Sequence, residues 1–95
     1  MRKPKIDPAL ARVERRHVLD YASALTVDRS DPSSVLANAK ALTDWMEVRD
    51  VADRKVRYYA LSRAHANRSY ARRPDNAPET LIAEAEVFYA FLKAA

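Results

Sequence analysis

The sequence predicts an all-α protein, a small four-helix bundle built from two helical hairpins. The chain has no glycine in 95 residues, whereas tight β-hairpins and phosphate-binding loops usually need it. Eighteen alanines and seventeen Lys or Arg residues favour helix. Apolar residues recur at steps of three and four between proline-marked turns. The length fits one domain, 1–95, with a basic arm at 1–6 followed by hairpins at 8–46 and 51–93.

The first helix is expected to begin at Asp7-Pro8, because proline is tolerated in the first turn of a helix and aspartate caps the N-terminus. Its predicted inner stripe consists of apolar residues and one histidine, namely Leu10, Val13, His17, Val18, Tyr21, Ala22 and Leu25. The helix should end after Val27, since 28–31 has turn chemistry ahead of Pro32.

An internal repeat supports the two hairpins. The stretch 32–46, PSSVLANAKALTDWM, matches 78–92, PETLIAEAEVFYAFL, forty-six positions later. Each copy begins with proline and ends with an aromatic and an aliphatic residue. We expect two duplicated helices that pack on each other about a pseudo-two-fold axis, with Leu42 and Phe88 as matched core positions and Asn76 capping the second copy. Chance similarity between two alanine-rich helices is the alternative.

The boundary between the second and third helices depends on 47–50. No proline or glycine interrupts 33–73, so one long bent central helix flanked by two shorter ones is the alternative fold. The repeat and a capping Asp50 favour a break before Val51. The third helix is then expected over 51–70, with an inner stripe made of Ala52, Val56, Tyr59, Ala60, Arg63 and Ala64.

Known catalytic and cofactor motifs are not found. There is no cysteine, so thiolate metal sites and disulfides are excluded. The two histidines, His17 and His65, fall on different predicted helices, and His17 is interpreted as a core-edge residue. No Gly-rich loop or nucleophile motif is present. We therefore expect a protein that is not an enzyme and binds neither cofactor nor metal. No apolar run is long enough to span a membrane and no signal peptide is recognised, so a cytoplasmic location is expected.

The helix 54–73 is strongly basic, with seven Lys or Arg residues and no acid. Its cationic stripe is the candidate interaction surface, and it consists of Arg54, Arg57, Tyr58, Leu61, His65, Arg68, Arg72 and Arg73. One interpretation is a phosphate-binding face of a nucleic-acid-binding protein. The other is a face whose arginines pair with the acidic residues that follow, which are Asp75, Glu79, Glu84 and Glu86.

A third interpretation is a protein-binding module. The large apolar residues exceed what one small core easily covers, and the candidates for exposure to a partner or to a second copy are Trp45, Met46, Tyr58, Leu61, Phe91 and Leu92. Aromatic residues, methionine and arginine are enriched at protein interfaces. Protein–protein interaction is therefore the leading predicted function, and nucleic-acid binding is the alternative.

The C-terminal sequence A-x-V-F-Y-x-F-L, residues 85–92, resembles the last helix of small uncharacterised all-helical proteins of actinobacterial phages and prophages. The likeness covers about 20 residues at the C-terminus and includes no catalytic motif. The resemblance implies a non-catalytic accessory protein that acts on a host or virion protein, and it assigns no functional residue.

Overall fold

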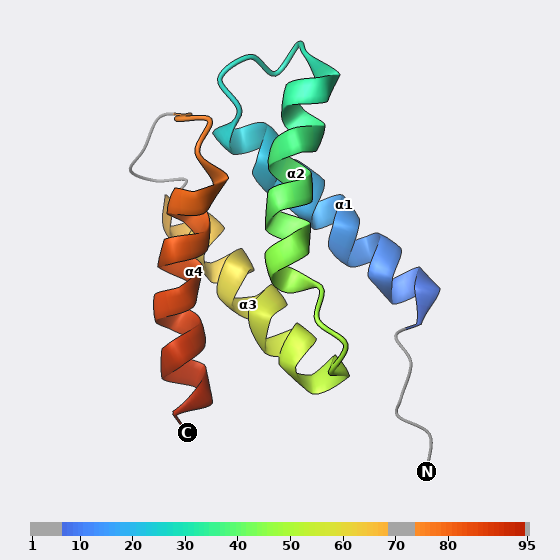
Figure 1. The fold of residues 1–95 in the computed structure, drawn as a ribbon, viewed down its shortest axis with the longest axis vertical. Helices are drawn as coiled ribbons and strands as arrows, with labels where there is room; N and C mark the ends of the chain where they lie inside the picture. Colours follow the sequence, from blue (N-terminus) through green and yellow to red (C-terminus); the bar gives the residue numbers. More distant parts are fainter. Residues whose placement is uncertain (1–6, 69–73, 95) are drawn as a thin grey trace.

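The computed structural model describes residues 7–68 and 74–94. These ranges form four helices and no strand: α1 (Pro8–Leu25), α2 (Pro32–Met46), α3 (Val51–Arg68) and α4 (Pro78–Lys93). Helix α1 packs on α2 and α3 packs on α4, as two hairpins (Figure 1). The predicted all-α fold with two helical hairpins is therefore confirmed. The basic arm at 1–6 and the predicted end of the third helix at 69–70 lie outside the described residues.

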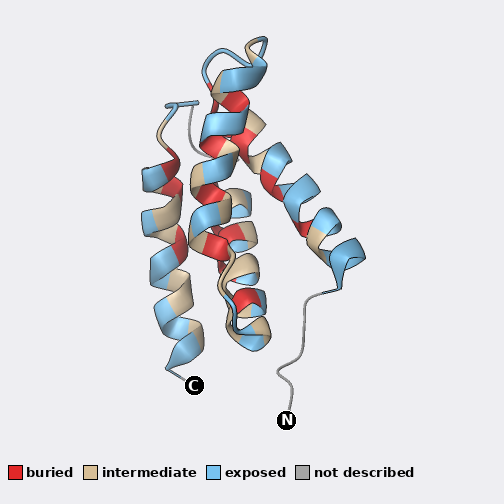
Figure 2. Ribbon diagram, turned by 45° about the vertical axis from the view of Figure 1, so that its right-hand side comes forward, coloured by how far each residue is buried: buried red, intermediate tan, exposed pale blue. Residues whose placement is uncertain are grey.

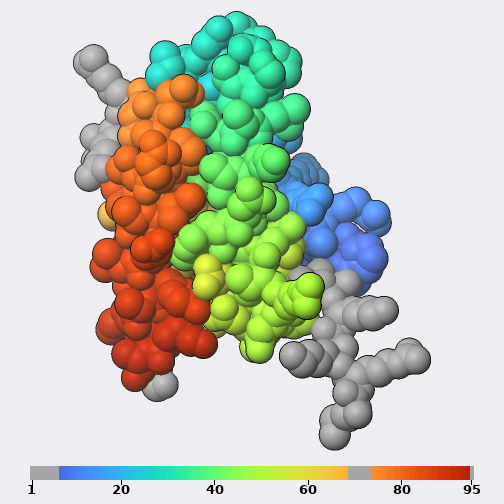
Figure 3. Space-filling model, viewed as in Figure 1, coloured from blue at the N-terminus to red at the C-terminus, as the bar shows by residue number. Residues whose placement is uncertain are grey.

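The helices form two layers. Helices α2 and α4 lie side by side on the face seen in Figure 3, with the N-terminal part of α1 standing out at one edge. Helices α1 and α3 lie behind them (Figure 1). The shortest dimension of the Cα trace is 16 Å, which fits two layers of helices packed about 8–10 Å apart.

Aspartates fix three helix starts, as the sequence predicts. The Asp7 carboxylate accepts from the Ala9 amide at 2.9 Å, and Asp31 accepts from the Ser33 amide at 3.1 Å. Asp50 accepts from the Asp53 amide at 2.9 Å, which places the start of α3 at Val51. Each bond satisfies an amide that has no partner inside its helix.

The break at 47–50 is confirmed, and the single long central helix is not formed. Beyond Met46 the chain turns, and the Arg57 guanidinium of α3 donates to the Trp45 carbonyl at 2.9 Å. That carbonyl belongs to the last turn of α2, whose acceptors lack intrahelical partners. A side chain from the next helix thus helps to end α2.

The expected cap of α4 is wrong. Ala77, not Asn76, occupies the N-cap position, and no side chain bonds to the first turn. Asn76 instead has a φ of 54°, the left-handed region that a chain without glycine must fill with another residue. Asparagine tolerates that region better than most residues. The turn is stabilised by the Asp75 carboxylate, which accepts from the Ala77 amide at 3.1 Å.

Asn76 ties the turn that precedes α4 to the end of α1 and to α2. Its amide donates to the Leu25 carbonyl at 2.8 Å, and its side-chain oxygen accepts from the Asn38 amide group at 3.0 Å. The same Asn38 nitrogen donates to the Thr26 hydroxyl oxygen at 2.9 Å. Thr26 is fully buried and donates to the Ala22 carbonyl at 2.6 Å. We call Thr26, Asn38 and Asn76 the loop latch.

The core is aliphatic and rich in alanine. Its largest fully buried apolar side chains are Leu42, Met46, Leu61, Leu81 and Val18. Alanines without exposed surface lie between them, and they are Ala22, Ala60, Ala64 and Ala85. Figure 2 shows the buried positions along the inward sides of the helices. Small side chains at these positions allow the helix axes to approach closely.

The repeated stretches are both helical, and they contact each other. Their matched central positions differ in burial, because Leu42 is fully buried whereas Phe88 is only partly covered. The Leu42→Ala substitution should lower the free energy of unfolding by about 2–5 kcal/mol. We expect a smaller decrease for Phe88→Ala. That the hairpins arose by duplication, with a pseudo-two-fold axis, stays a prediction.

The inner face of α3 is displaced from the predicted one. Ala60 and Ala64 are buried as expected, but Tyr59 and Arg63 of the predicted stripe are exposed. The buried residues added on the other side are Arg54, Leu61 and Arg68. The true face is rotated by roughly 100°, one residue position around the helix. The apolar pattern was misleading because long arginine stems pack inside while a tyrosine points outward.

The loop latch makes a stability prediction. Asn38→Ala removes both amide bonds and leaves the Asn76 oxygen without its partner, so the free energy of unfolding should fall by about 1–3 kcal/mol. Asn67→Ala, an exposed asparagine on α3, is the matched control and should be near neutral. Urea denaturation of both variants measures the difference. Equal midpoints for the two variants would contradict a stabilising latch.

Candidate functional site

The predicted cationic stripe lies largely inside the molecule. Arg54 and Arg68 are 5% and 7% exposed, and Leu61 is completely buried. Arg57, Tyr58 and His65 are half-buried, while Arg72 and Arg73 lie outside the described residues. The stripe therefore does not form a solvent-facing cationic surface over the described part of α3. This corrects the expectation that these side chains share one exposed face.

A buried charge network explains the position of Arg54. Its Nε donates to Glu14 Oε1 of α1 at 2.8 Å, and its Nη2 donates to Glu47 Oε1 at 3.2 Å. Arg15 of α1 donates two hydrogen bonds to the same Glu47, from Nε to Oε1 at 2.8 Å and from Nη2 to Oε2 at 2.9 Å. The four side chains join α1, the end of α2 and α3. Glu14 is buried with Arg54, so each charge depends on the other.

The Arg15 bond has opposite effects on the two ionisable partners. It holds the pKa of the Glu47 carboxyl below its ordinary value, and it raises the pKa of the Arg15 guanidinium. Burial of Glu47 works in the opposite direction but is outweighed. Glu47 is therefore anionic and Arg15 cationic at neutral pH, as a stable ion pair requires.

Arg57 and Arg68 are also engaged within the fold. The Arg57 guanidinium lies over the rings of Trp45 and Tyr89, 5.1 and 4.8 Å from their centroids, and pairs with Asp53 at 3.1 Å. The Tyr89 hydroxyl donates to the same carboxylate at 2.5 Å, and this bond is the main cause of the lowered pKa of Asp53. Arg68 pairs with Asp75. Pairing of the stripe with Asp75 was expected, whereas the partners of Arg54 and Arg57 were not.

Aromatic and polar side chains connect α1 to α3. The His17 Nδ1 hydrogen-bonds to the Tyr58 hydroxyl, and the Tyr21 hydroxyl bonds to Ser62 Oγ at 2.8 Å. The His65 ring stacks on Tyr21 with centroids 4.3 Å apart. His17 is exposed rather than at the core edge.

Burial lowers the pKa of His65 and raises the pKa of the Tyr58 hydroxyl, so both side chains favour their neutral forms. Within the described ranges 7–68 and 74–94, no group of three or more His, Asp or Glu side chains could hold a metal ion. The contacts of this region hold two helices together.

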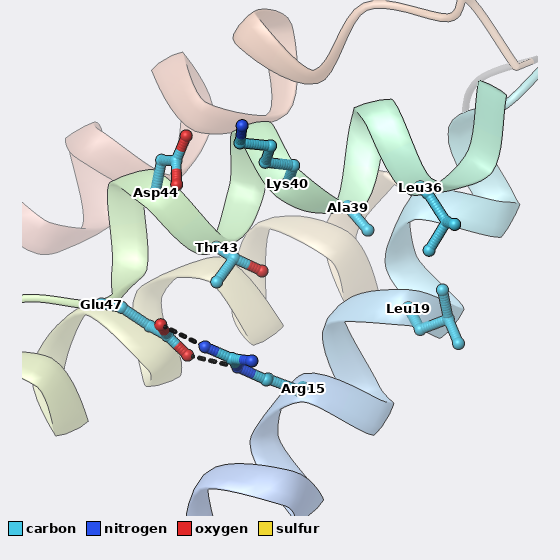
Figure 4. A pocket seen from close by; sticks show the side chains of 8 residues that line it. All are labelled: Arg15, Leu19, Leu36, Ala39, Lys40, Thr43, Asp44 and Glu47. Carbon is cyan, nitrogen blue, oxygen red and sulfur yellow. Dashed lines mark hydrogen bonds and ion pairs between the residues drawn. The ribbon is translucent and has the colours of Figure 1, made fainter. Parts of the chain in front are cut away.

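The candidate site is a groove of about 440 Å³ between α1 and α2 (Figure 4). Its lining residues are Arg15, Leu19, Leu36, Ala39, Lys40, Thr43, Asp44 and Glu47. Leu19 and Leu36 project from opposite helices near one end, and the Arg15–Glu47 ion pair lies toward the other (Figure 4). The exposed fractions are 40% for Leu19 and 59% for Leu36. The groove thus combines an apolar end with a charged end.

Two exposed cations of α1 lie on the flank of the helix that carries Leu19. Arg12 and Arg16 precede Leu19 by seven and three residues, which places them on the same flank of the helix. Both are exposed, and neither forms an ion pair within the described part of the chain. Lys40 adds a cation and Asp44 an anion on α2. The residues that line the groove carry no net charge, because Arg15 and Lys40 balance Asp44 and Glu47. Arg12 and Arg16 add positive charge on the adjoining flank of α1.

This groove was not among the predictions made from the sequence. Leu19 and Leu36 are apolar residues that fall off the main stripes of their helices, and this was the one local signal. To predict a groove, one must also know which flanks of α1 and α2 meet. That arrangement brings together residues distant in sequence, such as Arg15 and Glu47, which are 32 positions apart.

A second apolar surface lies between α3 and α4. A depression of about 220 Å³ is lined by Tyr59, Arg63, Phe88, Phe91 and Leu92. The predicted exposure of Phe91 is found, whereas Met46 and Leu61 are core residues and Trp45, Tyr58 and Leu92 are partly covered.

Among the described helices, none is both long and apolar enough to cross a membrane.

The buried network predicts a large effect for one arginine. Arg54→Met leaves Glu14 buried without its cation, so the free energy of unfolding should fall by about 3–5 kcal/mol. Lys55→Met, at the adjacent exposed position, should change it little. The double variant Glu14→Leu/Arg54→Met should regain much of the loss, because no unpaired charge remains. Chemical denaturation measures all three; equal stability of the two methionine variants would refute the role of Arg54.

Acid should weaken the same network through Glu47. A carboxyl whose pKa is lowered by folding contributes stability above its unfolded pKa, and that stability is lost as the pH falls through the folded pKa. The loss should therefore begin near the ordinary value of 4.5 and continue below it. Glu47→Gln should flatten the fall of the melting temperature in acid, whereas the exposed Glu86→Gln should keep the parent slope. Identical slopes for both variants would contradict the prediction.

Comparison with family models, with characterised proteins and with solved structures finds no significant match to this chain. The resemblance of 85–92 to phage and prophage proteins stays a prediction.

Proposed function

We propose that the protein is a non-enzymatic binding module whose α1–α2 groove receives an amphipathic helix of a partner protein. The observation that carries this proposal is the juxtaposition of exposed leucines with unpaired arginines. Leu19 and Leu36 offer apolar surface in a concave site. Arg12 and Arg16 share the flank of α1 that carries Leu19 and form no ion pair in the described ranges. Helices that bind grooves present apolar anchors at i, i+3 or i+4, and i+7.

The charge of the rim defines the chemistry of the partner. A helix with leucine or phenylalanine anchors and flanking Glu or Asp residues complements an apolar floor bordered by Arg12, Arg16 and Lys40. Two fully buried anchors would contribute roughly 3–6 kcal/mol before the costs of association. We therefore expect weak binding, with a Kd of about 0.1 mM or higher. From the resemblance to phage accessory proteins we further propose that this partner is a host or virion protein.

Nucleic-acid binding through 54–73 has less support than the sequence suggested. Arg54 and Arg68 are buried and ion-paired, and Arg57 is engaged with Asp53 and two aromatic rings. A phosphate would have to displace these internal partners. Phosphate contacts also give a steep dependence of affinity on salt, about 0.9 log unit per contact on duplex DNA. Salt-steep, sub-micromolar binding to DNA or RNA would overturn the proposed function.

The groove can be tested with designed peptides. A library of helical peptides, with one randomised face, is selected on the immobilised protein and the winners are measured by fluorescence anisotropy. We expect selection of Leu or Phe at helical spacing together with Glu or Asp. A scrambled peptide of equal composition should bind at least tenfold more weakly. Selected peptides that are basic, or that bind no better when helical, would contradict the proposal.

Matched variants locate the binding site. Leu36→Asp places a charge in the groove and should weaken the selected peptide by tenfold or more. Val13→Asp, on an exposed position of α1 outside the groove lining, is the control and should stay within about threefold of the parent protein. Arg12→Gln/Arg16→Gln should weaken binding mainly at low salt. Equal affinity of the Leu36 and Val13 variants would exclude the α1–α2 groove.

A further inference from the structure

The depression between α3 and α4 combines apolar walls with one cation. Its apolar walls are supplied by Tyr59, Phe88, Phe91 and Leu92. Arg63 is the one charged residue among the described lining residues, and we call these five residues the aromatic depression. Tyr59 and Phe91 are 59% and 79% exposed, so both rings can be reached from solvent. Sites for small molecules typically combine such walls with a few polar groups.

The Arg63 guanidinium is available to a ligand. Arg63 is exposed, and it forms no hydrogen bond or ion pair within 7–68 and 74–94. The exposed acids of α4 do not compensate it, because helical spacing puts Glu79 and Glu86 on the opposite side of that helix from Phe88. Glu84 already has a partner. The aromatic depression therefore has a positive charge that no described carboxylate neutralises.

Tyr59 adds a second hydrogen-bond donor to the aromatic depression. It precedes Arg63 by four positions, about one turn of α3, so the two side chains are neighbours on the helix surface. The Tyr59 hydroxyl has no hydrogen-bond partner in the part of the chain that the structure describes. A carboxylate can accept from a phenol and from a guanidinium, and its bond to the guanidinium is charge-assisted.

We infer that the aromatic depression binds a small carboxylic acid, in its ionised form, that carries an aryl or branched alkyl group. The apolar group lies against Tyr59, Phe88 and Phe91, and the carboxylate lies on Arg63. This inference does not depend on the α1–α2 groove.

Size and charge define the ligand class. The volume of about 220 Å³ is below the roughly 300–1,000 Å³ of sites for drug-sized ligands, so the ligand is about as large as one aromatic ring with a short acidic arm. The single cation balances one negative charge. A phosphate monoester carries a charge of about −1.5 to −2 at pH 7 and would need more. A monoanionic carboxylate is therefore the better match.

An NMR titration of the ¹⁵N-labelled full chain with phenylacetate, at constant ionic strength, tests the inference. We expect saturable shifts centred on the amides of Tyr59, Arg63, Phe88 and Phe91, with a Kd of about 1–10 mM for so small a ligand. Phenylacetamide has the same ring without the charge and should bind at least about threefold more weakly. Equal affinity for the amide, shifts centred on the α1–α2 groove, or no saturable shift would overturn the inference.

Matched variants test the parts of the cation and the ring. Arg63→Gln should reduce the affinity for phenylacetate to that for phenylacetamide. Lys55→Gln, about two turns earlier on α3, exposed and outside the depression lining, should bind like the parent. Phe91→Ala should weaken both ligands alike, because it removes one wall. An unchanged circular dichroism spectrum confirms that each variant is folded. An Arg63→Gln variant that still prefers the acid would contradict the part assigned to Arg63.

A short peptide ending in phenylalanine, with a free C-terminus, distinguishes a small ligand from the end of a protein chain. The peptide presents the same ring and carboxylate as phenylacetate. We expect it to bind no more tightly than phenylacetate, since the depression holds only one group of this size. A peptide that binds at least about tenfold more tightly would overturn the assignment to a small ligand.

Discussion

The arrangement of the first three helices depends on one buried guanidinium. Arg54 is almost completely removed from water, and a charge in that position is tolerated only when carboxylates surround it. Glu14 and Glu47 meet this requirement from α1 and from the end of α2. The requirement is directional, because two separate donor groups of one planar side chain have fixed orientations. It therefore specifies how α1, α2 and α3 are placed relative to each other, which apolar packing alone does less selectively.

The same network shapes the exposed surface. Arg15 reaches across to Glu47 at one end of the α1–α2 groove, so the packing of the interior determines where the groove closes. Internal pairing also withdraws Arg54 and Arg68 of α3 from the surface, whereas Arg63 stays exposed. The exposed surface keeps apolar residues near cations on α1, and an apolar group of Tyr59 and Phe91 on the other hairpin. The side chains available to a partner are thus those that the buried charge network does not engage.

Local signals were sufficient for the helices and their starts. Asp-Pro pairs at 7–8 and 31–32 and the capping Asp50 specify helix starts through neighbours within three residues, which a sequence pattern contains. The inner face of α3 could not be read in the same way. Tyr59 is aromatic but exposed, whereas Arg54 is charged but buried. The carboxylates that make burial of Arg54 possible lie 40 and 7 positions away, so a local pattern does not contain them. Asn76 was misassigned for the same reason, since its partner Asn38 is distant in sequence.

The loop latch has a consequence for the order in which the chain folds. Asn76 bonds to Asn38 across 38 positions and to the backbone at Leu25, so the turn that opens α4 is held by the turn that follows α1. Contacts of such sequence separation form only after the intervening chain has been closed into a loop, at an entropic cost. Neither hairpin alone contains both halves of these bonds. Each hairpin should therefore gain its full stability only when the other is docked, which makes folding cooperative across the whole chain rather than additive over two halves.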